Sequence, residues 1–201
     1  MKLTRDFYLQ SGLTVARDLI GKRLVHRTPE GVTAGIIVEA EAYMGRQDPA
    51  AHSYRASPRG RTAIQYGPGG FAYIYTIYGL HLCMNVVAGG EDVPEAVLIR
   101  ALEPVEGLAL MEKRRGTDKL LSLCSGPGKL SQAMGIQKSD YGADLCGDSL
   151  YIEATGTKTP PVAATKRIGI DYAGEAAGYL WRFILRDSPF VSVPPRSSKG
   201  S

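Results

Sequence analysis

Cysteine is scarce in this sequence. Only Cys83, Cys124 and Cys146 occur, and no two of them form a CxxC pair. This count argues against a disulfide framework, and the three histidines do not stand at zinc-ligand spacings from the cysteines. We therefore expect no metal and no cofactor, and we interpret the cysteines as small core residues.

Long hydrophobic runs are also missing. No apolar segment is long enough to cross a bilayer, and the N-terminal stretch MKLTRDFYLQSGL lacks the apolar centre of a signal peptide. These features predict a cytoplasmic protein with no membrane partner.

Acidic residues are slightly fewer than basic ones: the sequence has 24 Lys and Arg and 20 Asp and Glu, which gives a net charge of +4. So small a basic excess is compatible with a polyanionic partner but does not require one.

Repeats and linkers are absent as well, so the 201 residues predict one domain over residues 1–196, followed by a disordered tail at 197–201. Strands are predicted from apolar alternation or short apolar runs in KRLVHRT, TAGIIVEAEAY, FAYIYTIY, LHLCMNVVA, AVLIRALEP, SLYIEA, RIGI and WRFILR. Helices are predicted in LTVARDLIG, VEGLALMEKRR and GPGKLSQAMG. The expected fold is a mixed α/β (α+β) domain with a mostly antiparallel sheet.

The predicted strand that ends at Tyr43 carries two carboxylates. With a period of two, Glu39, Glu41 and Tyr43 share one face of this strand. One interpretation is a half-buried strand whose polar face is solvated, in which case the carboxylates have no special role. The other is that they belong to a functional site.

A long loop, residues 44–70, follows this strand and is rich in glycine, proline, serine and arginine. Loops of this length in compact domains are usually functional or disordered. Its arginines are Arg46, Arg55, Arg59 and Arg61, and four tyrosines, Tyr66, Tyr73, Tyr75 and Tyr78, lie near them. Aromatic rings among arginines suit stacking on nucleic-acid bases, worth about 1–3 kcal/mol per base. A tyrosine-rich core surface would explain the same pattern.

The tripeptide Tyr78-Gly79-Leu80 falls at the tip of a predicted hairpin. An exposed aromatic residue on a tight turn has little to bury within its own fold, and it has the shape of a wedge between base steps. Carboxylates beside tyrosines, an arginine-rich loop and this tip together indicate an enzyme that acts on an extruded base.

The segment GPGK at 126–129 predicts a turn that leads into a helix. Backbone N–H groups at the helix start, with Ser125 and Lys129 beside them, suit one phosphate. A plain turn with a helix cap is an equally good interpretation. A nucleoside-triphosphate loop is excluded, because its first glycine would fall at Leu123 and Lys129 is followed by Leu130.

Several motifs occur together in a familiar order: VEAEAY…DPAAHS, YIYTIYGLHLCMN, VLIRALEP, GPGKL and RIGI…WRF…SPFVS. Through them the chain, from about residue 5 to 193, resembles the alkyladenine (3-methyladenine) DNA glycosylase family, in its bacterial form. The resemblance implies a single domain with a curved, mostly antiparallel sheet flanked by helices, and a β-hairpin wedge that inserts into DNA. It implies a monomer without an obligatory protein partner. The implied activity is excision of damaged purines from double-stranded DNA, without strand cleavage.

The resemblance also implies roles for individual residues. Glu41 would be the general base that activates water, with Arg100 and the backbone carbonyl of Ile168 helping to place that water. Glu41 is favoured over Glu39 chiefly by the resemblance, and partly because it lies nearer Tyr43 and the loop. Glu39, about 7 Å away along the strand, would raise the pKa of Glu41 by like-charge repulsion.

The remaining implied roles concern the base and the DNA backbone. The base pocket would be lined by Tyr43 on one face of the base, by His52 and Tyr75 on the other, and by Ala51 and Asn85. Asn85 would clash with the 2-amino group of guanine, and Tyr78 would fill the gap left in the duplex. The DNA-backbone contacts would come from Arg55, Arg59, Arg61, Ser125, Gly126 and Lys129.

Two alternatives stay open at this stage. A non-catalytic damage sensor would keep the arginines, the wedge and the stacking residues without needing Glu41. A small-molecule hydrolase could use Glu41 but would have no affinity for duplex DNA.

Overall fold

The structure, a computed structural model, describes residues 1–156 and 161–194. The predicted tail at 197–201 and the predicted domain end at 196 lie outside the described residues. The strands are β1 Arg23–Thr28, β2 Gly31–Tyr43, β3 Ala72–Ile77, β4 His81–Ala88, β5 Glu95–Glu106, β6 Leu150–Glu153, β7 Val162–Thr165 and β8 Arg182–Leu185. The α-helices are α1 Arg5–Tyr8, α2 Gly12–Asp18, α3 Leu108–Arg115, α4 Leu120–Leu123 and α5 Pro127–Met134. Short 3-10 helices are η1 Gly45–Gln47, η2 Gly60–Tyr66, η3 Lys138–Asp140 and η4 Asp171–Gly178.

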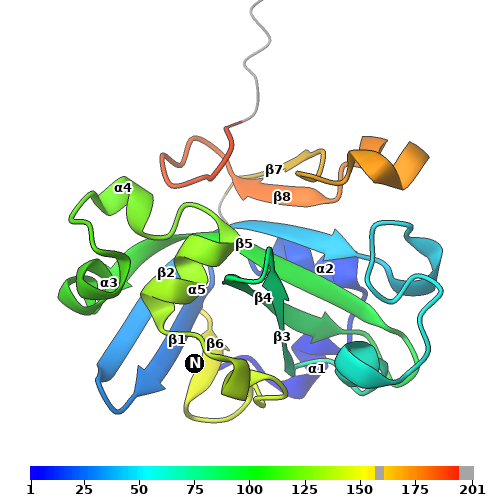
Figure 1. The fold of residues 1–201 in the computed structure, drawn as a ribbon, viewed down its shortest axis with the longest axis horizontal. Coiled ribbons are helices and arrows are strands. Elements are labelled where there is room, and N and C mark those ends of the chain that lie inside the picture. The colour runs from blue at the N-terminus through cyan, green and yellow to red at the C-terminus, as the bar shows by residue number, and fades with distance from the viewer. Residues whose placement is uncertain (157–160, 195–201) are drawn as a thin grey trace, which may run out of the picture.

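One antiparallel sheet organises the described chain (Figure 1). Its strand order is β3-β4-β5-β2-β1-β6, and β8 joins it by pairing with both β2 and β7. Helices α2 to α5 pack on this sheet, and α5 contacts β4 and β5 while α2 contacts β2. The predicted α+β fold class, a single domain with an antiparallel sheet and flanking helices, is confirmed.

Strand β2 changes its partner along its length. Its first part pairs with β1 from Gly31 to Ile36, whereas Glu39, Ala40 and Glu41 pair with β8. Register shifts against β5 between Ile37 and Ala40 mark an irregularity at this change of partner. With β5 on one edge and β8 on the other, both glutamates are fully buried, at 0% exposure. The interpretation of a solvated polar face is therefore wrong.

The segment RIGI, predicted as a strand, is a bend that leads from β7 to η4. Gly169 has a φ of +71° there, in the left-handed region that interrupts an extended strand. Strand β7, just before this bend, was not predicted. Its residues lack a strong alternation of polar and apolar side chains, and it gains its place by pairing with β8.

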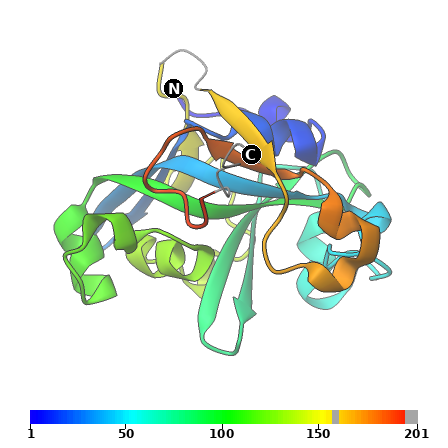
Figure 2. The same cartoon turned by 90° about the horizontal axis from the view of Figure 1, so that it is seen from above.

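The hairpin of β3 and β4 projects from the body of the molecule (Figure 2). Its tip is a tight turn at Tyr78 and Gly79, both with positive φ, closed by a hydrogen bond from Leu80 N–H to the Ile77 carbonyl. The tip side chains are 86% exposed at Tyr78 and 84% at Leu80. The predicted hairpin and its exposed aromatic residue are thus present in the fold.

The three cysteines are free, with Cys83 and Cys124 buried and Cys146 half-buried. The interpretation as small core residues is confirmed for the first two. Within residues 1–156 and 161–194, no helix is both long enough and apolar enough to cross a membrane.

Candidate active site

A cavity of about 400 Å³ opens between the hairpin, the loop after β2, strand β5 and the bend before η4. Its size is within the range typical of small-molecule sites, about 300–1,000 Å³. It brings together predicted site residues from five separate segments of the chain. Those in its wall are Tyr43, His52, Arg61, Tyr75, Tyr78, Asn85, Arg100 and Ile168.

Other predicted residues lie outside this wall. Ala51 is buried at 7% exposure, and its neighbour Ala50 lines the cavity instead. Glu41 stands behind the wall at 0% exposure. The predicted DNA-backbone residues that lie away from the wall are Arg55, Arg59, Ser125, Gly126 and Lys129.

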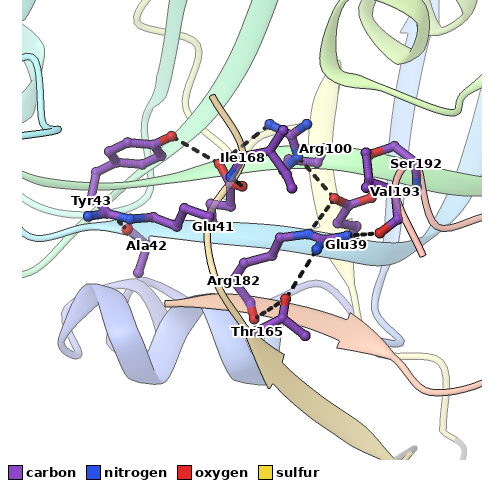
Figure 3. A network of polar contacts seen from close by, with 11 residues as sticks. Glu39, Glu41, Ala42, Tyr43, Arg100, Thr165, Ile168, Arg182, Ser192 and Val193 are labelled. Atoms are coloured by element: carbon purple, nitrogen blue, oxygen red, sulfur yellow. Dashed lines mark hydrogen bonds and ion pairs between the residues drawn. The ribbon is translucent and has the colours of Figure 1, made fainter. Parts of the chain in front are cut away.

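The Glu41 carboxylate is held by three donors that belong to wall residues (Figure 3). Oε1 accepts a 2.7 Å hydrogen bond from the backbone N–H of Ile168. Oε2 accepts from the Tyr43 hydroxyl at 2.9 Å and from Arg100 Nη1 at 3.4 Å. The carboxylate is therefore fixed in orientation directly behind the cavity surface. The group of Ile168 that contacts Glu41 is the N–H, and the role of the Ile168 carbonyl in placing water, which the resemblance implies, stays a prediction.

Burial raises the pKa of the Glu41 carboxyl above its ordinary value of 4.5. The Arg100 guanidinium, the Ile168 N–H and the Tyr43 hydroxyl lower the pKa and partly offset that effect, and Glu39 adds the smallest contribution, upward. The predicted repulsion from Glu39 thus exists but is minor. Tyr43 has a pKa raised well above 10.0, by burial first and then by Glu41, so its hydroxyl stays protonated and donates a hydrogen bond to the carboxylate.

Glu39 has its own set of hydrogen-bond donors and shares Arg100 with Glu41 (Figure 3). It accepts hydrogen bonds from Arg100 Nε at 3.0 Å, from Arg182 Nε at 2.7 Å and from the Ser192 N–H at 2.7 Å. Arg100 therefore bridges the two glutamates and compensates their charge. A buried carboxylate that is so fully paired suits a structural role.

Aromatic rings form one side of the cavity. The rings of His52 and Tyr75 meet edge to face, with centroids 4.5 Å apart. His52 Nδ1 lies 2.8 Å from the hydroxyl of Tyr73, which fixes the orientation of the imidazole. Burial and the nearby Arg61 lower the pKa of His52 below 6.5, so the ring is neutral at neutral pH.

Asn85 lies on the cavity wall at 3% exposure. Its Nδ2 donates a 3.1 Å hydrogen bond to the Tyr73 carbonyl, which holds the amide rigidly. A fixed side chain of this kind is able to exclude a bulkier base by steric contact.

The start of α5 lies at the edge of the cavity, where Pro127 forms part of the wall. Gly126 has a φ of +130° and a ψ of 151°, a conformation essentially limited to glycine. No side chain in the described residues caps this first turn. The alternative interpretation, a plain turn with a helix cap, is therefore not supported by a side-chain capping group. The phosphate site at Ser125, Gly126 and Lys129 stays a prediction.

Arg167, Asp48 and Gln65 are among the residues of the site that were not identified from the sequence. Arg167 and Asp48 form a buried ion pair next to Tyr43, and Gln65 lies in the cavity wall. Arg167 and Asp48 stand inside the motifs RIGI and DPAAHS, but nothing local distinguishes them from solvated charges. Gln65 sits in the long loop, where a polar residue carries no signal.

The sequence of this chain is similar to those of known proteins over nearly its whole length. The profile of the family described as methylpurine-DNA glycosylase matches residues 6–189. A protein of Alkaliphilus oremlandii is 48% identical over 200 residues, 96% of this chain and 99% of its own length. One of Clostridium acetobutylicum is 47% identical over 201 residues, 96% and 98% of the two chains. One of Bacillus licheniformis is 50% identical over 190 residues, 94% and 96%. All three carry the provisional name 3-methyladenine DNA glycosylase.

Proposed function

Because the chain belongs to the methylpurine-DNA glycosylase family, we propose that it excises alkylated or deaminated purines from double-stranded DNA with a water molecule activated by Glu41. Membership makes it a DNA-repair glycosylase, a hydrolase of N-glycosyl bonds that acts on DNA. The lesions in the proposal are 3-methyladenine, 7-methylguanine, ethenoadenine and hypoxanthine. The observation that carries it is the fixed carboxylate of Glu41 behind an aromatic cavity, held by donors that line that cavity.

The chemistry follows from the charge that develops on the sugar. As the bond from the sugar carbon to the base nitrogen breaks, the base leaves with the bonding electrons and positive charge builds on the sugar. A carboxylate stabilises this charge and accepts a proton from the water that attacks the sugar carbon. A water against Tyr43 and Arg100 in the cavity would lie next to Glu41 Oε2. No lysine is used as a nucleophile, so the product is an abasic site with the strand intact.

The cavity would hold the extruded base. Tyr43 would stack on one face, with His52 and Tyr75 on the other, and the exposed Tyr78 would occupy the space left in the duplex. Extrusion costs a few kcal/mol, and less for damaged or mispaired bases, which supplies part of the selectivity. Alkylated bases leave readily because they are electron-poor. The departure of a neutral base depends more strongly on groups in the pocket.

Contacts to the DNA backbone are proposed for the exposed arginines Arg55, Arg59 and Arg61 and for the start of α5 at Ser125, Gly126 and Lys129. Such contacts give affinity that is independent of sequence and falls with salt. One chain supplies every residue named here, so we propose a monomer that acts on DNA in the cytoplasm without an obligatory protein partner.

Single-turnover excision from duplexes that carry each lesion in turn tests the proposal. We expect base release by the wild type, and a loss of at least about a hundredfold in Glu41→Gln with duplex binding retained. Glu175→Gln, an exposed glutamate in η4, is the matched control.

The outcomes separate the alternatives. Binding of damaged duplexes without release of any base would indicate a non-catalytic sensor. Absence of both binding and release would indicate an enzyme for small molecules. Either result would overturn the proposed function.

A further inference from the structure

One polar group in the cavity wall has no role in the reaction described above. Gln65, in η2, lines the cavity and is 2% exposed. Its Nε2 is buried and has no hydrogen-bond partner in residues 1–156 and 161–194. Buried polar groups in proteins are nearly always paired, and an unpaired donor at a binding site is explained most simply by a ligand that pairs with it.

The neighbours of Gln65 are already committed to other contacts. The Tyr73 hydroxyl lies 2.8 Å from His52 Nδ1, and Asn85 Nδ2 donates to the Tyr73 carbonyl at 3.1 Å. Burial raises the pKa of Tyr73 to about 12, and the Gln65 amide, one of the lesser influences, lowers it through a polar interaction with the phenol. The amide thus lies beside the Tyr73 hydroxyl, but the geometry of a hydrogen bond from Gln65 Nε2 is not met. Of the two side-chain amides in the wall, Asn85 is anchored through its nitrogen to the Tyr73 carbonyl, whereas Gln65 Nε2 has no hydrogen-bond partner within the described residues.

We propose that Gln65 is a specificity-determining residue whose amide donates a hydrogen bond to a carbonyl oxygen of the extruded base, so that the pocket favours oxopurines such as hypoxanthine among neutral lesions. The inference rests on the proposed function and deepens it by naming the class of base. The terminal torsion of a glutamine side chain is soft, so Nε2 turns toward the cavity at little cost.

Ethenoadenine is the informative comparison. It is also a neutral lesion, so its departure makes a similar demand on the pocket, but it has no carbonyl oxygen. With this base the Gln65 donor stays unpaired. A site whose buried polar group is left unpaired discriminates against such a ligand.

The test compares wild type with Gln65→Met, which keeps the length of the side chain and removes the amide. Gln47→Met, at an exposed position outside the cavity, is the control. Two quantities are measured on hypoxanthine and ethenoadenine duplexes: the single-turnover excision rate, and the dissociation constant in a Glu41→Gln background. We expect the preference for hypoxanthine over ethenoadenine to fall about tenfold or more in Gln65→Met, in both rate and binding. The preference stays within twofold of wild type in Gln47→Met.

Equal effects on the two lesions, or no effect on either, would overturn the role of Gln65. Gln65→Leu repeats the comparison should the methionine variant fail to fold. If the wild type releases no base at all, the proposed function fails, and the binding ratio still decides the inference about Gln65.

Discussion

Arg167 and Asp48 form an ion pair in which neither side chain is exposed to solvent, with Arg167 Nη2 2.9 Å from Asp48 Oδ1. The same guanidinium lies 4.8 Å from the ring of Tyr43 and 4.9 Å from the ring of Trp181. Arg167 precedes Ile168 in the chain, so a single side chain lies against two of the three residues that donate to Glu41, Tyr43 and Ile168. We infer that Arg167 is a positioning residue for the carboxylate.

We expect Arg167→Lys to lower the single-turnover excision rate about tenfold or more. Lysine keeps the charge but lacks the planar, forked donor that holds Asp48 and stacks on two rings. Duplex affinity should change less than threefold, because Arg167 is buried, and Arg186→Lys at an exposed position is the control. An excision rate within twofold of wild type would contradict the positioning role.

The pH dependence of excision should report the ionisation of Glu41. Only the ionised carboxylate accepts a proton from water, so the rate rises with pH through the pKa of Glu41. Burial raises that pKa, so we expect the midpoint to lie above the ordinary value of 4.5. Single-turnover rates on a hypoxanthine duplex from pH 4 to 8 measure it. A midpoint at or below the ordinary value would show that another group limits the rate.

The contribution of Glu41 to folding stability should fall as the pH rises, whereas the excision rate should increase. The pKa of Glu41 is raised in the folded state, so the buried carboxyl favours folding while it is neutral, and this contribution is lost as pH rises through the folded pKa. Glu41→Gln removes the buried charge. We therefore expect its melting temperature to exceed that of wild type by about 2 °C or more at pH 8.

The advantage of Glu41→Gln should shrink as the pH falls through the raised pKa of Glu41, because the wild-type carboxyl then becomes neutral as well. Thermal unfolding curves of both proteins across this range provide the measurement. A variant that is less stable than wild type at pH 8 would show that the hydrogen bonds of the carboxylate outweigh its burial.

The hairpin tip offers two equally exposed apolar side chains for comparison. We expect Tyr78→Ala to lower excision at subsaturating enzyme about tenfold, since one stacking contact is worth about 1–3 kcal/mol. Leu80→Ala should lower it less than threefold. Both variants should melt within about 2 °C of wild type, because neither side chain is buried. A larger effect at Leu80 than at Tyr78 would exclude Tyr78 as the wedge.

Asn85→Ala should admit undamaged guanine, because the shorter side chain leaves room for the 2-amino group. The measurement is guanine release from an undamaged duplex, with hypoxanthine release in the same variant as the control for folding. Guanine release that stays undetectable while hypoxanthine is excised would remove the steric role of Asn85.

Much of the fold was readable from local patterns. Apolar alternation and short apolar runs correctly predicted β1 to β5, a period of two placed Glu41 and Tyr43 on one face of β2, and the turn residues located the exposed hairpin tip. Strand β7 and the bend at Ile168 were misjudged, because pairing and a positive φ at Gly169 decide them. Local sequence sets the backbone torsion preferences and decides which side chains share a face of a strand. This information is enough to predict an element whose own sequence has a strong pattern.

The tertiary structure alone decided the environment of the carboxylates. Ile168 is 127 residues from Glu41 along the chain, and Ser192 is 153 residues from Glu39. Whether a glutamate on a strand face is solvated or buried depends on which distant segments cover that face and bring donors to it. That outcome is set by the free energy of packing the whole chain, in which a buried charge persists only when such partners are assembled around it.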